Sequence, residues 1–349
     1  MTFPLELTSL TKVFPTPSGP FVAVKNVNVD IETGEFVAIL GHSGCGKSTV
    51  LSIIAGLDQA TYGGVVIDGK AVNGPGSDRG MVFQAPCLLP WLTARQNVEL
   101  AAAQRVPRRR RRETLAAAHA YLDMVGVGEA ADQLPSQLSL GTQQCVSLAR
   151  ALAVEPRFLL LDEPFSQLDS LTRFDLQDTL LRVWDLSGKT VVMVTHDVDE
   201  ALFLADRLIL MTDGPEATIG DVLAVPFVRP RARASVLGHA QYHACRRRVL
   251  DFLDHHAHQS RASVLDDVLE PSPDPVGANA PNGHETIVTP DGHTVDRSDG
   301  NVPYRVPGLV LWLKPDRRQT RDPLPRTQER RRQSETTGCT HTAASPRAT

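Results

Sequence analysis

The sequence contains one stretch that restricts its fold more than any other, Gly41-His-Ser-Gly-Cys-Gly-Lys-Ser-Thr49. An apolar run precedes it at residues 36–40, and another follows at residues 50–55. The order strand, glycine-rich turn, helix brings backbone N–H groups and the positive end of a helix together around an anion. A chance turn would have to match every fixed position of G-x-x-x-x-G-K-[ST] as well as both flanking elements. The stretch therefore predicts a site for a nucleoside triphosphate.

The residues of this loop have separate physical tasks. The glycines let the backbone curl so that its N–H groups point inward, and Lys47 supplies a positive charge for the β- and γ-phosphates. The hydroxyl of Ser48 is placed to ligate Mg²⁺. We predict that the nucleotide is held by Gly41, His42, Ser43, Gly44, Cys45, Gly46, Lys47, Ser48 and Thr49.

The composition argues against several kinds of partner and location. The formal net charge of −4 disfavours a general nucleic-acid-binding protein. No apolar run approaches the roughly 20 residues that cross a bilayer, and the N-terminus lacks a basic segment followed by a long apolar core. The 5 cysteines are scattered without C-x-x-C spacing, which indicates a reducing compartment and no zinc site. We therefore expect the chain in the cytosol.

An arginine-rich run occupies residues 105–112. Such a run can bind nucleic acid or acidic lipid, but this one opens a helical hairpin and has no interleaved aromatic residues. We favour a solvated helix entrance over a binding site.

The order of the apolar patterns predicts an α/β fold. The N-terminal part is β-rich at residues 5–31, with a proline-rich loop at 15–20. Continuous apolar strands then alternate with helices, as in a parallel sheet covered on both faces. We expect strands at 36–40, 64–69, 80–84, 157–162, 190–195 and 207–211, and helices at 93–104, 112–125, 142–153, 168–186 and 197–204. This string predicts a P-loop α/β core with an inserted helical lobe at about 90–150.

The C-terminal third of the chain has a different composition. Residues 214–236 suggest a last hairpin and a proline-basic turn, and residues 246–254 suggest a final helix. Beyond about residue 262 the proline-rich and arginine-rich segments predict disorder. A small apolar patch at residues 306–313 has no assigned role.

Polar side chains follow three of the predicted buried strands. Asp162 would hold Mg²⁺ through water, and Glu163 would orient or deprotonate the attacking water. An exposed acidic turn is the alternative, and the preceding phosphate loop argues against it. Gln84 ends another strand, where its amide can reach both metal and water. His196 follows a third strand. A lone histidine is usually structural, so the functional interpretation of His196 rests on its place in the order of motifs.

That order resembles the nucleotide-binding subunit of ABC transporters over residues 4 to about 255. The matching features are the phosphate loop, Gln84, Ser139-x-Gly141, Asp162-Glu163, Asp169 and His196. The resemblance implies an ABC ATPase core with an N-terminal antiparallel β subdomain. It divides the chain into an ABC ATP-binding domain at residues 4–258 and a low-complexity, disordered extension at 259–349.

The resemblance also implies particular roles for single residues. Phe14 becomes the aromatic that stacks on adenine, Gln84 the Q-loop residue and Asp169 the D-loop aspartate. His196 becomes the switch histidine that contacts the γ-phosphate, and Glu163 remains the carboxylate that acts on the attacking water.

ATP and Mg²⁺ are the implied cofactors, with Mg²⁺ held by Ser48, Gln84 and Asp162. Two subunits pair head to tail around two ATP molecules, and each ATP touches the phosphate loop of one subunit and Ser139 and Gly141 of the other. Only closure surrounds the γ-phosphate with donors and excludes water. The other implied partners are integral-membrane permease subunits and, indirectly, a periplasmic or lipoprotein solute-binding protein, with no nucleic acid. The chain would lie at the cytoplasmic face of the cell membrane.

The motif offered to the partner departs from the family pattern. The family has Leu-Ser-Gly-Gly-Gln or a close variant, whereas this chain reads Leu138-Ser-Leu-Gly-Thr-Gln-Gln-Cys145. Leu140 replaces a glycine and adds an isobutyl group where backbone approaches phosphate. Cys145 stands where an arginine is usual. In a homodimer both nucleotide sites would be impaired. In a heterodimer only the site that this chain's motif completes would be impaired.

Several stretches resemble the nitrate/sulfonate/taurine importer branch, and the nitrate type above all. They lie at residues 88–93, 171–178, 191–201, 211–220 and 225–231. This resemblance implies import of a small anion, nitrate first (or nitrite or cyanate), with a sulfonate or taurine as the alternative. The apolar stretch 88–92 would form part of the groove for a cytoplasmic helix of the membrane subunit, or else pack ordinarily in the helical lobe.

Two other classes of function stay open at this stage. A soluble ABC ATPase of DNA repair or translation would call for a long coiled coil or a second nucleotide domain, and the sequence has neither. A low-turnover regulatory ATP-binding subunit of a heterodimeric pair would be consistent with the altered motif at Leu140.

Overall fold

The computed structural model describes residues 4–105 and 111–268, together with four short strands between residues 287 and 311. The chain divides into two units, Met1–Ser272 and Pro273–Thr349. Residues 106–110 of the arginine run, most of the predicted extension and parts of the apolar patch at 306–313 lie outside the described residues. The second unit holds two antiparallel pairs, β11 (Ile287–Val288) with β12 (Thr294–Val295) and β13 (Tyr304–Val306) with β14 (Leu309–Leu311).

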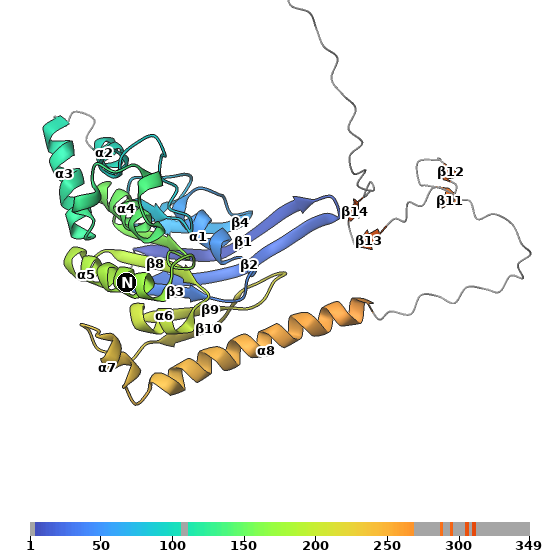
Figure 1. Ribbon diagram of the computed structural model, residues 1–349. Helices are drawn as coiled ribbons and strands as arrows, with labels where there is room; N and C mark the ends of the chain where they lie inside the picture. Colours follow the sequence, from blue (N-terminus) through green and yellow to red (C-terminus); the bar gives the residue numbers. More distant parts are fainter. Residues whose placement is uncertain are drawn as a thin grey trace, which may run out of the picture. The chain divides into compact units, whose positions relative to one another are not determined.

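The first unit contains the remaining elements that Figure 1 labels. Its strands are β1 (Leu5–Thr16), β2 (Gly19–Ile31), β3 (Phe36–Leu40), β4 (Tyr62–Ile67), β5 (Lys70–Ala71), β6 (Arg79–Val82), β7 (Phe158–Asp162), β8 (Thr190–Thr195), β9 (Arg207–Met211) and β10 (Ile219–Ala224). Its helices are α1 (Lys47–Ala55), α2 (Ala94–Arg105), α3 (Arg111–Met124), α4 (Leu140–Ala153), α5 (Ser170–Ser187), α6 (Val198–Leu204), α7 (Arg233–Leu237) and α8 (Tyr242–Val268).

The central sheet determines where the functional side chains meet. It has six strands in the order β10-β9-β3-β8-β7-β6, and all neighbouring pairs except β10–β9 are parallel. Because the carboxyl ends of parallel strands lie at one edge of a sheet, the segments that follow β3, β6, β7 and β8 are neighbours there. That edge carries the predicted phosphate loop and the polar residues after the other three strands.

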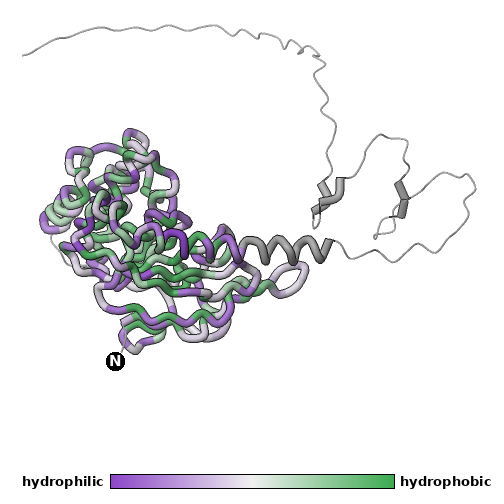
Figure 2. Tube along the Cα trace, turned by 90° about the horizontal axis from the view of Figure 1, so that it is seen from below, coloured by the Kyte–Doolittle hydropathy of each residue, from purple (hydrophilic) through white to green (hydrophobic). Residues whose placement is uncertain are grey.

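Each central strand sends alternate side chains into two separate apolar cores. Phe36, Ala38 and Leu40 of β3 face the core shared with α4, α5 and α6. Val37 and Ile39 face the core shared with α1 and the N-terminal sheet. All five are buried, which explains why the strand is continuously apolar rather than alternating. Figure 2 shows the hydrophobic stretches concentrated along these strands.

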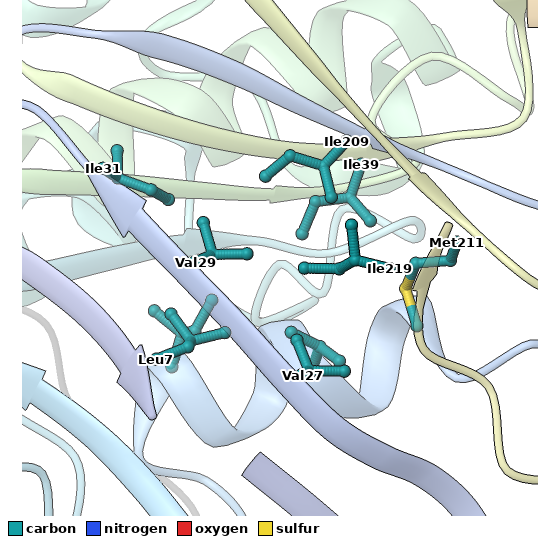
Figure 3. A pocket seen from close by; sticks show the side chains of 10 residues that line it. Leu7, Val27, Val29, Ile31, Ile39, Ile209, Met211 and Ile219 are labelled. Carbon is teal, nitrogen blue, oxygen red and sulfur yellow. The ribbon is translucent and has the colours of Figure 1, made fainter. Parts of the chain in front are cut away.

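The N-terminal segments form a second, antiparallel sheet in the order β2-β1-β4-β5. Its apolar face packs against the central sheet and α1, as Figure 3 shows for side chains from both sheets. A cavity of about 10 Å³ remains between them. It is lined only by apolar side chains, so a water molecule there would find no hydrogen-bond partner.

The helices α2, α3 and α4 pack together as a lobe inserted between β6 and β7 (Figure 1). Its ends lie close to the predicted bounds of about 90–150. The predicted fold class, a P-loop α/β core with an antiparallel β subdomain and an inserted helical subdomain, is therefore confirmed in the described residues.

The N-terminal hairpin is longer than the sequence pattern indicates. The prolines at 15 and 20 were expected in a loop, but they pair with each other across β1 and β2, and only residues 17–18 form the turn. The strand β4 pairs with β1 only as far as Thr11. Among the described residues, no second strand pairs with β1 beyond Thr11, and proline is tolerated there because no second ladder needs its missing N–H.

The proline-basic turn is held against the central domain by its arginines. Arg229 lies over the ring of Trp184 at 3.9 Å and donates to Asp206. The side chain of Arg231 is 1% exposed and donates to the backbone oxygens of Phe203 and Ala205. The arginines of this segment therefore have a structural role: they hold the turn against the central domain.

The final helix extends beyond the predicted 246–254 in both directions, and the predicted domain boundary at residue 258 falls inside α8. Its N-terminal part packs on the core through Tyr242 and Val249, which are buried. Among the described residues, no helix combines the length and the apolar composition needed to cross a membrane.

Candidate functional site

The loop between β3 and α1 has the backbone geometry that an anion cradle needs. Gly44 and Gly46 have φ of 83° and 92°, in the left-handed region that favours glycine. A Cβ on Gly46 would also lie 2.6 Å from the Cγ1 atom of Val24. The glycine at position 46 is therefore required twice, by its backbone angle and by close packing against β2.

Lys47 opens α1 and lies inside this loop. Its side chain is buried, and Nζ donates to the backbone oxygens of Gly41 at 2.8 Å and His42 at 2.7 Å. The ammonium group is thus held by the same backbone that would surround a phosphate. Burial raises the pKa of the neighbouring Cys45 thiol and so keeps it in the neutral form at ordinary pH.

Ser48 and Asp162 meet although 114 residues separate them. Ser48 Oγ donates to Asp162 Oδ1 at 2.8 Å, because α1 starts beside the end of β7. Burial raises the pKa of Asp162, and the bond from Ser48 and the charge of Lys47 act in the opposite direction. A hydroxyl and a carboxylate oxygen side by side are hard ligands of the kind that Mg²⁺ prefers, so these residues fit the predicted metal site.

Glu163 stands at the centre of the polar cluster. His196 Nδ1 lies 3.3 Å from its Oε2 atom, and Gln84 Nε2 lies 3.5 Å from the same oxygen. Glu163 has a φ of 44°, unusual for a residue with a side chain, and its N–H donates to Val194 O at 2.9 Å. Strained backbone of this kind persists where the surrounding structure over-determines it, often at active sites. The strands β7, β8 and β6 together bring these three side chains to one place.

Two contacts around Gln84 were not singled out from the sequence. Gln84 Nε2 also donates to Ser166 Oγ at 3.2 Å, and Ser166 donates to Glu163 O. Gln144 of α4 donates to the backbone oxygen of Phe83, the residue before Gln84. The helical lobe is therefore tied to the segment that carries Gln84. The position of Ser166, three residues after Glu163, was the only signal available in the sequence.

A third contact missed from the sequence joins the phosphate loop to the segment after β9. His42 Nδ1 lies 2.8 Å from Asp213 Oδ1, across 171 residues of chain. Because β9 is the neighbour of β3, the loops that follow these two strands meet. No local pattern predicts this pair.

Ser139, expected to touch a partner's nucleotide, and the expected D-loop residue Asp169 lie at the starts of two helices. Ser139 caps α4 by accepting from Thr142 N at 3.1 Å, and Asp169 caps α5 by accepting from Leu171 N and Thr172 N. These cap bonds lower the pKa of Asp169. Within the described residues, neither side chain is hydrogen-bonded to the cluster at Glu163.

The starts of α4 and α5 fit closely together. Gly141 is buried, and a Cβ built on it would lie 2.2 Å from the Cγ2 methyl of Thr172. The neighbouring Leu140, which departs from the family pattern, is 38% exposed. The isobutyl group that replaces a glycine therefore projects at the surface rather than filling the core.

Phe14, the predicted adenine-stacking residue, lies on β1 of the N-terminal sheet and is half-buried. It pairs in register with Phe21 of β2, which is 44% exposed. Its ring faces the ammonium group of Lys12 at 4.9 Å. The sequence motif therefore identifies an accessible aromatic side chain, separate from the cluster at Glu163.

Comparison with known proteins gives the same assignment for this part of the chain. Residues 24–166 match the family described as ABC transporter. The nitrate import ATP-binding protein NrtD of Synechococcus elongatus is 48% identical over 249 residues, which are 71% of this chain and 91% of that protein. The bicarbonate transport ATP-binding protein CmpD of Synechocystis sp. is 47% identical over 249 residues, 71% of this chain and 88% of that protein.

Two further similarities are to a longer protein and to a solved structure. The nitrate import ATP-binding protein NrtC of Synechocystis sp. is 44% identical over 267 residues, which are 76% of this chain and 40% of that protein. A solved dimer of the ATP-binding cassette MJ0796, bound to ADP and Pi in a post-hydrolysis state, has a TM-score of 0.58 at 37% identity. The match covers 64% of this chain and 100% of that one.

Proposed function

This chain belongs to the family of ABC transporter ATP-binding proteins, and from that premise we propose that it powers the import of a small oxyanion, nitrate before others. It is an ATPase of an import system. The proposal for nitrate rests chiefly on one observation, the 48% identity with a nitrate import ATP-binding protein over 91% of that protein's length.

In the proposed mechanism, Lys47 and the loop N–H groups bind the phosphates of ATP, and Glu163 accepts a hydrogen bond from the water that attacks the γ-phosphorus. The O–P bond to the leaving ADP breaks as the new bond to water oxygen forms, and Glu163 is the first acceptor of the proton. His196 lies 3.3 Å from Glu163 and would orient that carboxylate. The contact of His196 with the γ-phosphate is part of the proposal. The amide of Gln84 donates to the same oxygen of Glu163.

Mg²⁺ is part of this proposal. Ser48, Asp162 and Gln84 would hold it, and the adjacent Ser48 hydroxyl and Asp162 carboxylate support the assignment. The ion would supply positive charge against the phosphate oxygens of ATP. The raised pKa of Asp162 follows from burial beside Glu163, and a bound cation favours the ionised form.

The anion itself is assigned by similarity, because the chain's described site is devoted to ATP. Bicarbonate is the second candidate, since a bicarbonate transport ATP-binding protein is 47% identical over the same length of 249 residues. Nitrate and bicarbonate are both small, planar, singly charged oxyanions. A sulfonate or taurine, which the sequence also suggested, has no counterpart among the relatives described above.

We propose further that the chain pairs with a second, different ATP-binding subunit. The exposed isobutyl group of Leu140 stands where the family has glycine, so two copies of this chain would carry the obstruction at both nucleotide sites. The similarity to both NrtD and NrtC of nitrate import systems supports such a pair. The pair would bind permease subunits at the cytoplasmic face of the membrane, through the apolar segment 88–92 in which Trp91 is 71% exposed.

An uptake assay tests the transported anion and the chemistry together. A strain lacking the gene should take up ¹⁵N-nitrate slowly at limiting concentration, and the wild-type gene should restore uptake. Glu163→Gln should not restore it, because the amide cannot accept the water's proton; the expected loss is on the order of 100-fold or more. Glu216→Gln, at an exposed carboxylate paired with Lys25, should restore uptake fully.

The same strains separate the alternatives. If ¹⁴C-bicarbonate uptake is lost and nitrate uptake is normal, the anion assignment is wrong and the ATPase assignment stands. If Glu163→Gln restores nitrate uptake, this chain does not carry the working catalytic carboxylate. That result would support the hypothesis of a regulatory subunit.

A further inference from the structure

We infer that Lys12 and Asp58 act as positioning residues for the nucleobase, by bracing the ring of Phe14 against the far end of the phosphate-binding helix. The inference rests on the proposed role of Phe14 as the surface on which adenine stacks. The pair is called the Lys12–Asp58 strut below.

The Lys12 ammonium group makes two hydrogen bonds and is shielded from solvent. Lys12 Nζ lies 2.6 Å from Asp58 Oδ1 and donates to the backbone oxygen of Gln59 at 2.9 Å. The side chain of Lys12 is only 13% exposed, so solvent competes weakly for its ammonium group. The bond from Lys12 lowers the pKa of Asp58, so that this carboxylate is ionised at neutral pH.

The strut joins the two ends of the proposed ATP site. Asp58 and Gln59 follow α1, whose first residue is Lys47 of the phosphate loop. The same segment is bonded to β1 a second time, because Thr61 N donates to Thr11 O and Val13 N donates to Thr61 Oγ1. The position of β1 relative to the phosphate-binding helix is therefore set at the three residues that precede Phe14.

The backbone of β1 is shaped for this purpose. The pairing of β1 with β2 shifts register on both sides of Lys12, between Leu10 and Lys12 and again between Lys12 and Val13. Such irregularities re-aim side chains and are common beside functional sites. Here they place Lys12 over the Phe14 ring, with its ammonium group 4.9 Å from the ring centroid.

A cation on one face of an aromatic ring has two consequences for a ligand on the other. It is attracted to the ring and fixes the ring's orientation. It also draws electron density towards itself, which makes the opposite face a better surface for an electron-rich purine. A braced Phe14 therefore contributes to binding of the base and not to binding of the phosphates.

The test uses two ligands to distinguish binding of the base from binding of the phosphates. Isothermal titration calorimetry of the full-length chain should compare ATP with inorganic tripolyphosphate, both with Mg²⁺. Lys12→Met keeps the apolar stem and removes the charge; it should raise the Kd for ATP about three- to tenfold, within the range of one cation–π contact. The Kd for tripolyphosphate should stay unchanged. Lys12→Arg, which keeps a cation over the ring, should bind ATP as the wild type does.

Two further variants complete the design. Lys25→Met is the matched control, because Lys25 also lies in the N-terminal sheet and is also ion-paired, at 2.7 Å to Glu216, yet contacts no aromatic ring among the residues that the structure describes. It should leave both affinities unchanged. In a Phe14→Ala background, Lys12→Met should have no further effect on ATP, because the ring through which it acts is gone.

Each contrary outcome identifies what fails. Equal weakening for ATP and tripolyphosphate would mean that Lys12 serves only general stability, and the inference is wrong. Normal ATP affinity in Lys12→Met, with weakened affinity in Phe14→Ala, would refute the strut and leave the proposed adenine site standing. Normal ATP affinity in Phe14→Ala would remove the proposed stacking role and the inference with it.

Discussion

Glu200 is a carboxylate buried beneath the segment that carries His196. It is 5% exposed, accepts from Gln177 Nε2 at 3.0 Å, and lies in α6, four residues after the histidine. Burial raises its pKa from 4.5 to about 7; the bonds from Thr195 and Gln177 and the charge of Arg173 act in the opposite direction. At pH 6 this side chain is therefore mostly protonated in the folded protein and mostly ionised in the unfolded chain.

The raised pKa predicts a pH dependence of stability. The contribution of protonated Glu200 is fully present below about pH 4.5 and is lost as pH rises through about 7. A shift of this size corresponds to about 3 kcal/mol at most. Glu200→Gln should lack this dependence. In urea unfolding, the free energy of unfolding of the variant should therefore increase relative to that of the wild type between pH 5 and pH 8.

The comparison needs a control for other titrating groups. Glu129→Gln changes an exposed glutamate and should follow the wild type at every pH. If Glu200→Gln loses stability relative to the wild type as pH rises, the buried carboxylate is ionised in the folded state and the assignment of its pKa is wrong.

At the scale of single residues, the sequence was most informative where function depends on neighbours in the chain. The phosphate loop and Glu163 follow their strands directly, and Asp162 is the last residue of β7, so a local sequence pattern identifies them. Ser166, by contrast, matters only because Gln84 folds onto it, and the bond spans 82 residues. The pair His42–Asp213 and the Lys12–Asp58 strut likewise depend on which loops the sheet order brings together, and a single sequence does not contain that order.

At the scale of elements, the starts of α4 and α5 behave as one packed unit. Gly141→Ala should destabilise the protein by about 1–3 kcal/mol, because its methyl group overlaps Thr172 Cγ2. Thr172→Ser removes that methyl and should recover most of the loss in the double variant. Thermal unfolding of the four proteins measures the coupling; additive effects would show that the two residues do not meet.

The elements also show why boundaries were harder to predict than their types. The strands and helices of the core were expected in the right order, because their apolar runs are long. The expected loop at 15–20 proved to be strand, since no second strand among the described residues pairs with β1 there, which removes the usual objection to proline. The proline-basic turn was expected from its composition, but only the positions of Trp184 and Asp206 reveal why it carries arginines.

At the scale of the whole molecule, the first unit should be independent of the residues that follow it. Deleting residues 273–349 should leave the melting temperature and ATP affinity unchanged, because the compact unit ends at Ser272. Deleting everything from residue 242 should instead lower the melting temperature sharply, since Tyr242 is buried and donates to Asp199 at 2.6 Å. Loss of ATP binding in the shorter deletion would contradict this division.

Pairing is also a property of the whole molecule. With hydrolysis blocked by Glu163→Gln, the purified chain should remain monomeric in the presence of ATP, because Leu140 obstructs closure at both sites of a homodimer. Adding Leu140→Gly should permit an ATP-dependent dimer, which size-exclusion chromatography with light scattering would detect. A stable dimer of Glu163→Gln with Leu140 in place would show that the isobutyl group is no obstacle to self-association.

The strand β3 divides its side chains between two cores, and the phosphate loop begins where it ends. A ligand held by that loop is therefore linked to the cooperative unfolding of both layers. ATP at 100 times its Kd should add about 2.7 kcal/mol to the free energy of unfolding of the entire domain. In a cell where nucleotide runs low, the same linkage makes the empty subunit the form most exposed to proteolysis, so energy supply governs its lifetime as well as its activity.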